Sequence, residues 1–233
     1  MSQIIPPVKK ALQAMIDGFA ELNPSINQEQ AHELLTRMVT LLGHTGDFKT
    51  KLAELDQCLD DAPDFEPLYH YFFDLLMLSF IASDSAMMDE NYLESEEWIK
   101  IEDETSDKGS ELLNIYVYLQ ESFVQEIETG LQDYLQEFLL ADDELYQDDF
   151  FIYEELIKSD SWMDASIQEV IQHADDIKSP ELEEVFIPMM AFFNRQDSAE
   201  HIEAALRKDS AMAALNIALY RALKAFESGL KES

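Results

Sequence analysis

The stretch LYHYFFDLLMLSFIA, from Leu68 to Ala82, is the most apolar run of the chain. Pro67 precedes it, as expected at a helix start, where the first amide groups have no partner within the helix. Leucine, phenylalanine, tyrosine and methionine cover nearly the whole circumference of a helix with this sequence, so we expect it to be central and surrounded by other helices. The run is shorter than a membrane span and contains His70 and Asp74, which indicates a core helix.

Helical signals continue on both sides of this run. No proline occurs between residues 68 and 179, and the interval contains only two glycines. Apolar residues recur at spacings of three and four in most segments, and no segment combines strict alternation with the turn residues of a hairpin. The sequence therefore predicts an all-α fold, a globular bundle of about nine or ten helices without a sheet.

Three boundaries follow from local signals. Residues 102–109 are polar and turn-rich and predict an exposed loop. The apolar stripe over 110–138 predicts one long helix with a bend at Gly130. Ser179 followed by Pro180 predicts a helix start, and Pro188 is expected to kink or end that helix after one or two turns. We expect a single domain over residues 1–233, with 102–109 as the place of any division into two lobes.

The net charge of −34 is unevenly distributed along the 233 residues. Residues 1–53 contain five acidic and five basic side chains, and residues 191–233 contain six of each. This leaves 38 of the 49 acidic side chains in residues 54–190, against four of the 15 basic ones. The two ends are neutral, and the centre is a polyanion.

This composition excludes several classes of protein. A hydrophobic content of 47% with 14 phenylalanines supports a sizeable core, unlike an acidic disordered chain. Direct binding to nucleic acid or to an anionic membrane needs a basic surface, so neither is expected. The first residues lack the basic and apolar segments of a secretory signal, and we expect a cytoplasmic protein.

No cofactor or metal is expected. The pair Glu29 and His32 has the spacing used in di-iron bundles, but those bundles need the motif twice and the chain has it once. A single cysteine, Cys58, excludes an internal disulfide. Nucleophile motifs, glycine-rich phosphate loops and zinc spacings are absent from the sequence.

His70 and Asp74 are the candidate pocket residues. Their spacing of four places them on one side of an otherwise apolar helix. One interpretation is a buried polar pair in which the imidazole satisfies the carboxylate. The other is a pair that contacts a ligand or acts as a general acid and base in a pocket.

A second set of candidates consists of aromatic and acidic side chains in the polyanionic centre. Aromatic rings among acids are either core anchors or the lining of a groove that receives a partner's apolar and basic residues. The residues with this prediction are Tyr92, Trp98, Asp142, Asp143, Glu144, Asp148, Asp149 and Trp162.

The leading functional hypothesis is a non-catalytic helical binding protein of the chaperone, adaptor or immunity type. So many acids repel one another in a compact fold, and a basic protein or peptide partner explains their retention. One alternative is a nucleic-acid mimic that inhibits a DNA-binding protein. Another is an enzyme or ligand-binding protein with a pocket around His70 and Asp74. The sequence predicts no oligomeric state.

Overall fold

The computed structural model describes residues 4–84, 92–139 and 147–232, which contain no β-strand. The all-α prediction is confirmed, with a few more helices than expected. The α-helices of these residues are α1 (Pro6–Glu21), α2 (Gln28–Gly43), α3 (Phe48–Asp60), α4 (Tyr69–Ser79), α5 (Glu96–Thr105), α6 (Leu112–Val124), α7 (Leu131–Asp133), α8 (Gln147–Ile157), α9 (Ile167–Gln172), α10 (Pro180–Phe193), α11 (Ala199–Asp209) and α12 (Ala213–Leu230).

Shorter helical turns connect several of these helices. The 3₁₀ turns are Pro63–Leu68, Tyr92–Glu94, Asp160–Trp162 and Ala174–Asp176, and the π turns are Phe80–Asp84 and Tyr134–Phe138. No helix of the described residues has the length and apolarity needed to cross a membrane.

Polar side chains determine where several helices begin. Asn27 accepts a hydrogen bond from the backbone of Gln30, whose side chain accepts one from the backbone of Asn27. Ser179 caps α10 ahead of Pro180, so the predicted start is confirmed. The helix does not end at Pro188, which is buried within it, because core packing offsets the missing hydrogen bond.

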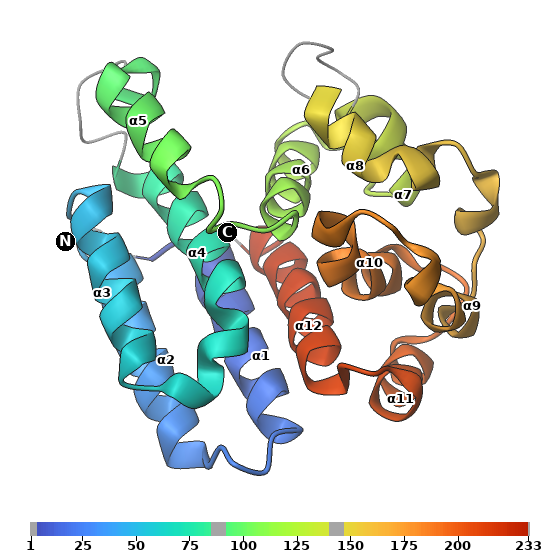
Figure 1. The fold of residues 1–233 in the computed structure, drawn as a ribbon, viewed down its shortest axis with the longest axis horizontal. Coiled ribbons are helices and arrows are strands. Elements are labelled where there is room, and N and C mark those ends of the chain that lie inside the picture. Colours follow the sequence, from blue (N-terminus) through green and yellow to red (C-terminus); the bar gives the residue numbers. More distant parts are fainter. Residues whose placement is uncertain (1–3, 85–91, 140–146, 233) are drawn as a thin grey trace.

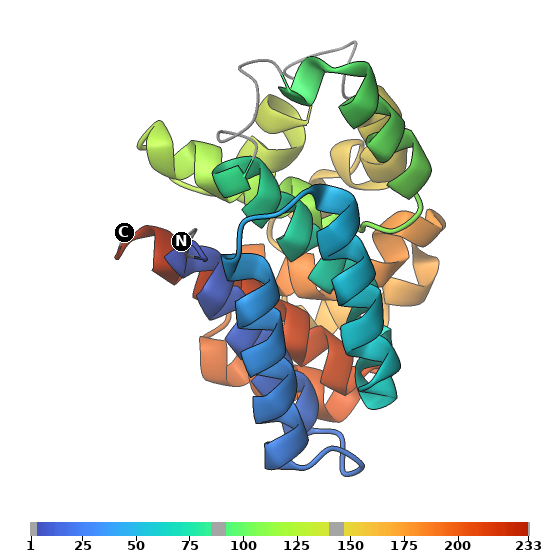
Figure 2. The ribbon, with the colours of Figure 1, turned by 90° about the vertical axis from the view of Figure 1, so that its left-hand side faces the viewer.

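Helix α4 is the central helix, as its composition predicts. All its residues from Tyr71 to Ser79 are buried, including the polar Asp74 and Ser79. It packs against α1, α3 and α6. In Figure 1 α4 stands between α3 and α6, and Figure 2 shows α2 and α3 on the viewer's side of α1.

The first and last long helices pack along each other, and we call this contact the α1–α12 seam. Two glycines permit the close approach: a Cβ at Gly229 would lie 2.6 Å from the Cα of Pro7, and one at Gly18 would lie 3.1 Å from the Cα of Ala218. Buried apolar side chains from both halves of the chain form one continuous cluster around this seam. A division into two lobes stays a prediction.

The prediction of one long helix over 110–138 is wrong. Helix α6 ends at Val124, Glu126 takes a left-handed conformation (φ 57°), and Gly130 is extended. The hydroxyl of Tyr118 stabilises this break, because it accepts the N–H of Gly130 at 2.9 Å and donates to Asp133 at 2.8 Å. A side chain of α6 therefore binds the backbone N–H of Gly130, which a continuous helix would bond to a backbone carbonyl oxygen.

The predicted loop over 102–109 is partly helical. Helix α5 continues to Thr105, whose hydroxyl donates to the carbonyl oxygen of Ile101 at 2.7 Å. The chain then leaves the helix and runs past α4 to α6, as Figure 1 shows. This connection, residues 106–111, forms part of the site described next.

Candidate binding site beside His70 and Asp74

Asp74 lies on α4 and is fully buried (0% exposed). Its carboxyl group accepts the backbone N–H of Ser110 at 2.9 Å and interacts with the Ser110 hydroxyl at 2.5 Å. Burial raises the pKa of Asp74 to about 8, against the effect of the bonds from Ser110, and the nearby Glu111 and Glu184 add to the rise. A Cβ at Gly109 would lie 3.1 Å from Asp74 Oδ1, so glycine lets the connection pass close to this carboxyl group.

His70, one turn before Asp74, is half-buried and uses the same connection. Its Nδ1–H donates to the carbonyl oxygen of Lys108 at 2.9 Å. The interpretation in which the imidazole satisfies the carboxylate is therefore wrong. Each side chain instead binds residues 108–110, because the backbone and the Ser110 hydroxyl supply partners that sequence spacing does not show.

Lys108 adds a third link between the connection and its surroundings. Its Nζ donates to the hydroxyl of Tyr69 at 3.0 Å and lies 5.2 Å from the centre of that ring. The Tyr69 hydroxyl donates in turn to Asp56 on α3 at 2.8 Å. Three side chains of α4, namely Tyr69, His70 and Asp74, thus hold the connection in place.

A cavity of about 870 Å³ opens beside this connection, between α4, the end of α5, the start of α6 and the start of α10. We call it the acidic cavity. His70 lines it, and Phe73, Met77 and Leu113 supply apolar surface. Its carboxylates are Glu102, Asp107, Glu111, Glu181 and Glu184.

The carboxylates of the acidic cavity have few partners. No lysine or arginine is among the described residues that line it. Glu111 accepts a hydrogen bond from the amide of Asn114 at 3.0 Å, and Glu181 accepts one from the Ser179 hydroxyl at 2.9 Å. Among the residues that the structure describes, no ion pair joins Glu102, Asp107 or Glu184 to a cation. The cavity is therefore a concave surface of one sign of charge.

Asp74 itself does not line the cavity, because Gly109 and Ser110 cover it. His70 is the one of the two predicted pocket residues that faces the open space. Across the described parts of the chain, no group of three or more His, Cys, Asp or Glu side chains is arranged to hold a metal ion.

The aromatic candidates lie elsewhere. Trp98 is 1% exposed and stacks on Phe80 at a centroid distance of 5.3 Å, so it is a core side chain. Tyr92 is half-buried, 5.8 Å from the Trp98 ring. Trp162 is half-buried against Phe186, 5.2 Å away. None of the three lines the acidic cavity.

The acidic candidates fall at or beyond the edge of the described structure. Asp142, Asp143 and Glu144 lie outside the described residues. Asp148 and Asp149 belong to the first turn of α8, of which the structure describes the backbone at these positions. Their role in partner binding stays a prediction.

The cavity acids themselves were not among the sequence candidates. The sequence marks both of their regions as helix boundaries, through the turn-rich residues 102–109 and the start at Ser179. It contains no signal that these two boundaries meet, since about 70 residues separate them.

Comparisons with family models, with curated proteins and with solved structures found no match to this chain. The function is therefore argued from the site alone.

Proposed function

We propose that this protein is a non-catalytic binding protein for a basic protein or peptide, and that the acidic cavity receives a lysine or arginine side chain of that partner. The observation that carries the proposal is the set of five carboxylates around one concavity without a lining lysine or arginine. A chaperone, an adaptor or an immunity protein has this kind of activity.

The electrostatics of the cavity support a cationic ligand. Carboxylates with low-dielectric surface between them concentrate a negative potential in a concave site and raise the local concentration of cations. Elsewhere the same chain neutralises its acids: Glu104 on α5 lies within 3.5 Å of both Lys49 and Lys100. Cations thus pair with acids where α5 meets α3, and no lysine or arginine lines the acidic cavity.

The construction of the cavity also supports ligand binding. Its wall at residues 108–110 is attached to α4 through the hydrogen bonds of His70 and Asp74. A wall fixed before binding loses less entropy when a ligand enters. Phe73 and Met77 provide apolar contacts for the methylene groups of a lysine or arginine, whose charged end then reaches the carboxylates.

A catalytic role for His70 and Asp74 as a pair receives less support. Nδ1 of His70 is bonded to a carbonyl oxygen, and Asp74 is covered by Ser110. The carboxyl group therefore does not contact a molecule in the cavity in this conformation.

The test is capture of partners from a native lysate at about 50 mM and about 500 mM salt, where screening differs strongly. The wild type is compared with the triple variant Glu102→Gln, Glu181→Gln, Glu184→Gln. A matched control removes three exposed acids away from the cavity, through Asp17→Asn, Glu29→Gln and Glu94→Gln.

We expect the wild type and the control to retain the same basic protein at low salt. The cavity variant should not retain it, and high salt should release it from the wild type and the control. Recovery of no partner, of partners insensitive to salt, or of equal amounts on the cavity variant would contradict the proposal.

A further inference from the structure

A second feature of the surface is apolar. Phe123, Val124 and Ile127 are 46%, 75% and 44% exposed, although they follow one another closely where α6 ends. In a continuous helix, Phe123 and Ile127 would share the buried face of Leu119. Helix α6 ends at Val124, so Phe123 lies in its last turn, and the break at Glu126 takes Ile127 out of the helix register. Exposed apolar residues that cluster in this way are typical of an interaction surface.

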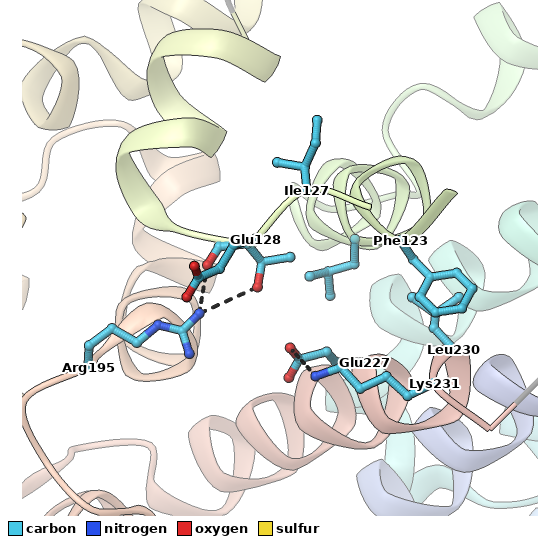
Figure 3. Close-up of a pocket in the computed structure, with 9 residues that line it drawn as sticks. Phe123, Ile127, Glu128, Arg195, Glu227, Leu230 and Lys231 are labelled. Carbon is cyan, nitrogen blue, oxygen red and sulfur yellow. Dashed lines mark hydrogen bonds and ion pairs between the residues drawn. The ribbon is translucent and has the colours of Figure 1, made fainter. Parts of the chain in front are cut away.

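These residues border a depression of about 300 Å³, which we call the apolar pocket. It lies between the end of α6, the residues after it, Arg195 beyond α10, and the end of α12. Figure 3 shows Ile127 above, Phe123 at the right, Arg195 with Glu128 beside it at the left, and Glu227 and Lys231 below. Its size suits one bulky side chain rather than a large cofactor.

Arg195 differs from the other arginines of the chain. Arg37, Arg207 and Arg221 each pair with at least one carboxylate. Arg195 is exposed, and its Nη2 donates to the carbonyl oxygen and hydroxyl of Thr129 at 2.6 and 3.4 Å. Within the described residues no carboxylate pairs with it.

The other charged side chains of the pocket do not supply Arg195 with a carboxylate partner. Two carboxylates line the pocket together with Arg195, namely Glu128 and Glu227. Glu227 already pairs with Lys231 at 2.9 Å and Lys224 at 3.3 Å, and no ion pair joins Glu128 to Arg195 among the described residues. An arginine held at the rim of an apolar pocket without a carboxylate partner is complementary to a carboxylate from another molecule.

We propose that the apolar pocket binds a segment of a partner protein in which a bulky apolar residue stands beside an aspartate or glutamate. The apolar residue fills the space between Phe123 and Ile127, and Arg195 pairs with the carboxylate. The segment is thus opposite in charge to the ligand of the acidic cavity, and this proposal does not depend on that one.

The test uses random 12-residue peptides displayed on phage and selected on the wild-type protein. Peptides that bind Ile127→Ser are removed first, so that binders of the acidic cavity do not accumulate. The enriched peptides should combine Leu, Ile, Phe or Met with a neighbouring Asp or Glu. No enrichment, or enrichment of basic peptides, would overturn the proposal.

The best peptide is then synthesised with a fluorescent label and titrated by polarisation. Phe123→Ser and Arg195→Gln should each weaken its binding about tenfold or more. The controls Ile99→Ser and Lys9→Gln change an exposed apolar and an exposed basic residue elsewhere and should leave the affinity unchanged.

Sedimentation of the wild type and of Ile127→Ser tests whether a second copy of the chain, instead of a partner segment, covers the pocket. A wild-type dimer that this substitution dissociates would show that a second copy covers the pocket, and would overturn the proposal. Monomers in both cases agree with it.

Discussion

The α1–α12 seam and the acidic cavity both contain glutamate carboxylates, which are paired with arginines at the seam and lie without a lining lysine or arginine in the cavity. Where α11 meets the seam, Glu21 of α1 and Glu203 of α11 lie between Arg207 of α11 and Arg221 of α12, with four contacts of 2.6–3.4 Å. In the acidic cavity, five carboxylates share a space that no lysine or arginine lines. Carboxylates paired with arginines join helices, and the carboxylates of a cavity that no lysine or arginine lines are available to a cationic ligand.

This contrast refines the argument from net charge. Counting by segment locates the excess acid in residues 54–190. The structure adds that these acids form a candidate site where they line a cavity that no lysine or arginine lines.

The buried carboxyl group behind the acidic cavity should have the largest effect, through pH. The pKa of Asp74 is about 8 in the fold against an ordinary 3.8, so the folded state keeps a proton that the unfolded chain loses. Its contribution to stability is therefore complete below about pH 4, falls as the pH rises, and is lost by about pH 8.

Asp74→Asn isolates this effect, because asparagine keeps the shape and cannot ionise. In urea unfolding between pH 5 and 9, the variant should gain stability relative to wild type by up to about 1.4 kcal/mol per pH unit until about pH 8. The charges of Glu111 and Glu184 add to the rise in the pKa of Asp74, so Glu184→Gln should move the end of this window to lower pH. Parallel curves for wild type and Asp74→Asn would show that Asp74 is ionised throughout.

The seam itself should be sensitive to a single methyl group. In Gly229→Ala the new Cβ would lie 2.6 Å from the Cα of Pro7, a backbone atom that cannot rotate away. We expect a loss of about 1–3 kcal/mol in the free energy of unfolding. Gly130→Ala is the control, since no atom lies within 4 Å of its Cβ and its backbone is extended. Equal stability of the two variants would mean that α1 and α12 pack less closely than described.

Local sequence signals predict some elements of this fold well and others poorly. The apolar run at Leu68–Ala82 predicts a surrounded helix, and α4 is buried from Tyr71 to its end. Periodicity and caps are local properties, and they predict the helix at Ser179 well. The fold class follows from such local signals alone.

The break in the apolar stripe over 110–138 depends on more distant contacts. Its periodicity agrees with one helix, and the hydroxyl of Tyr118 is the group that binds Gly130 instead. The acidic cavity depends on contacts between residues far apart in the sequence, such as Asp74 with Ser110, 36 positions apart. His70 lines the cavity, but its partner, the carbonyl oxygen of Lys108, has no signature in the sequence.

The Arg–Glu network should give an intermediate effect. Arg221 donates to Glu203 at 2.6 and 2.9 Å and to Glu21 at 2.6 Å, in a partly buried place. Arg221→Gln should cost about 1–2 kcal/mol at pH 7. Arg195→Gln, which removes an arginine without a carboxylate partner, should cost less.

The same substitution has a pH signature. Arg221 holds the pKa of Glu203 below its ordinary 4.5, so the stability from this pair is present above that value and is lost as the pH falls below it. The difference between wild type and Arg221→Gln should therefore shrink below about pH 4.5. A difference that stays constant would assign the effect to packing of the arginine stem.

Removal of charge from the acidic cavity should have the smallest effect on stability, and with the opposite sign. Glu102, Glu181 and Glu184 repel one another without a described cation between them, so the triple glutamine variant should melt about 1–3 °C above wild type at low salt. Added salt should remove the difference, because it screens exposed charges. The seam offers the matched comparison: Glu203→Gln removes one carboxylate and should lower the melting temperature, since two arginines lose a partner. Melts followed by circular dichroism would contradict the contrast if both variants moved in the same direction, because carboxylates in the cavity and at the seam would then have the same energetic role.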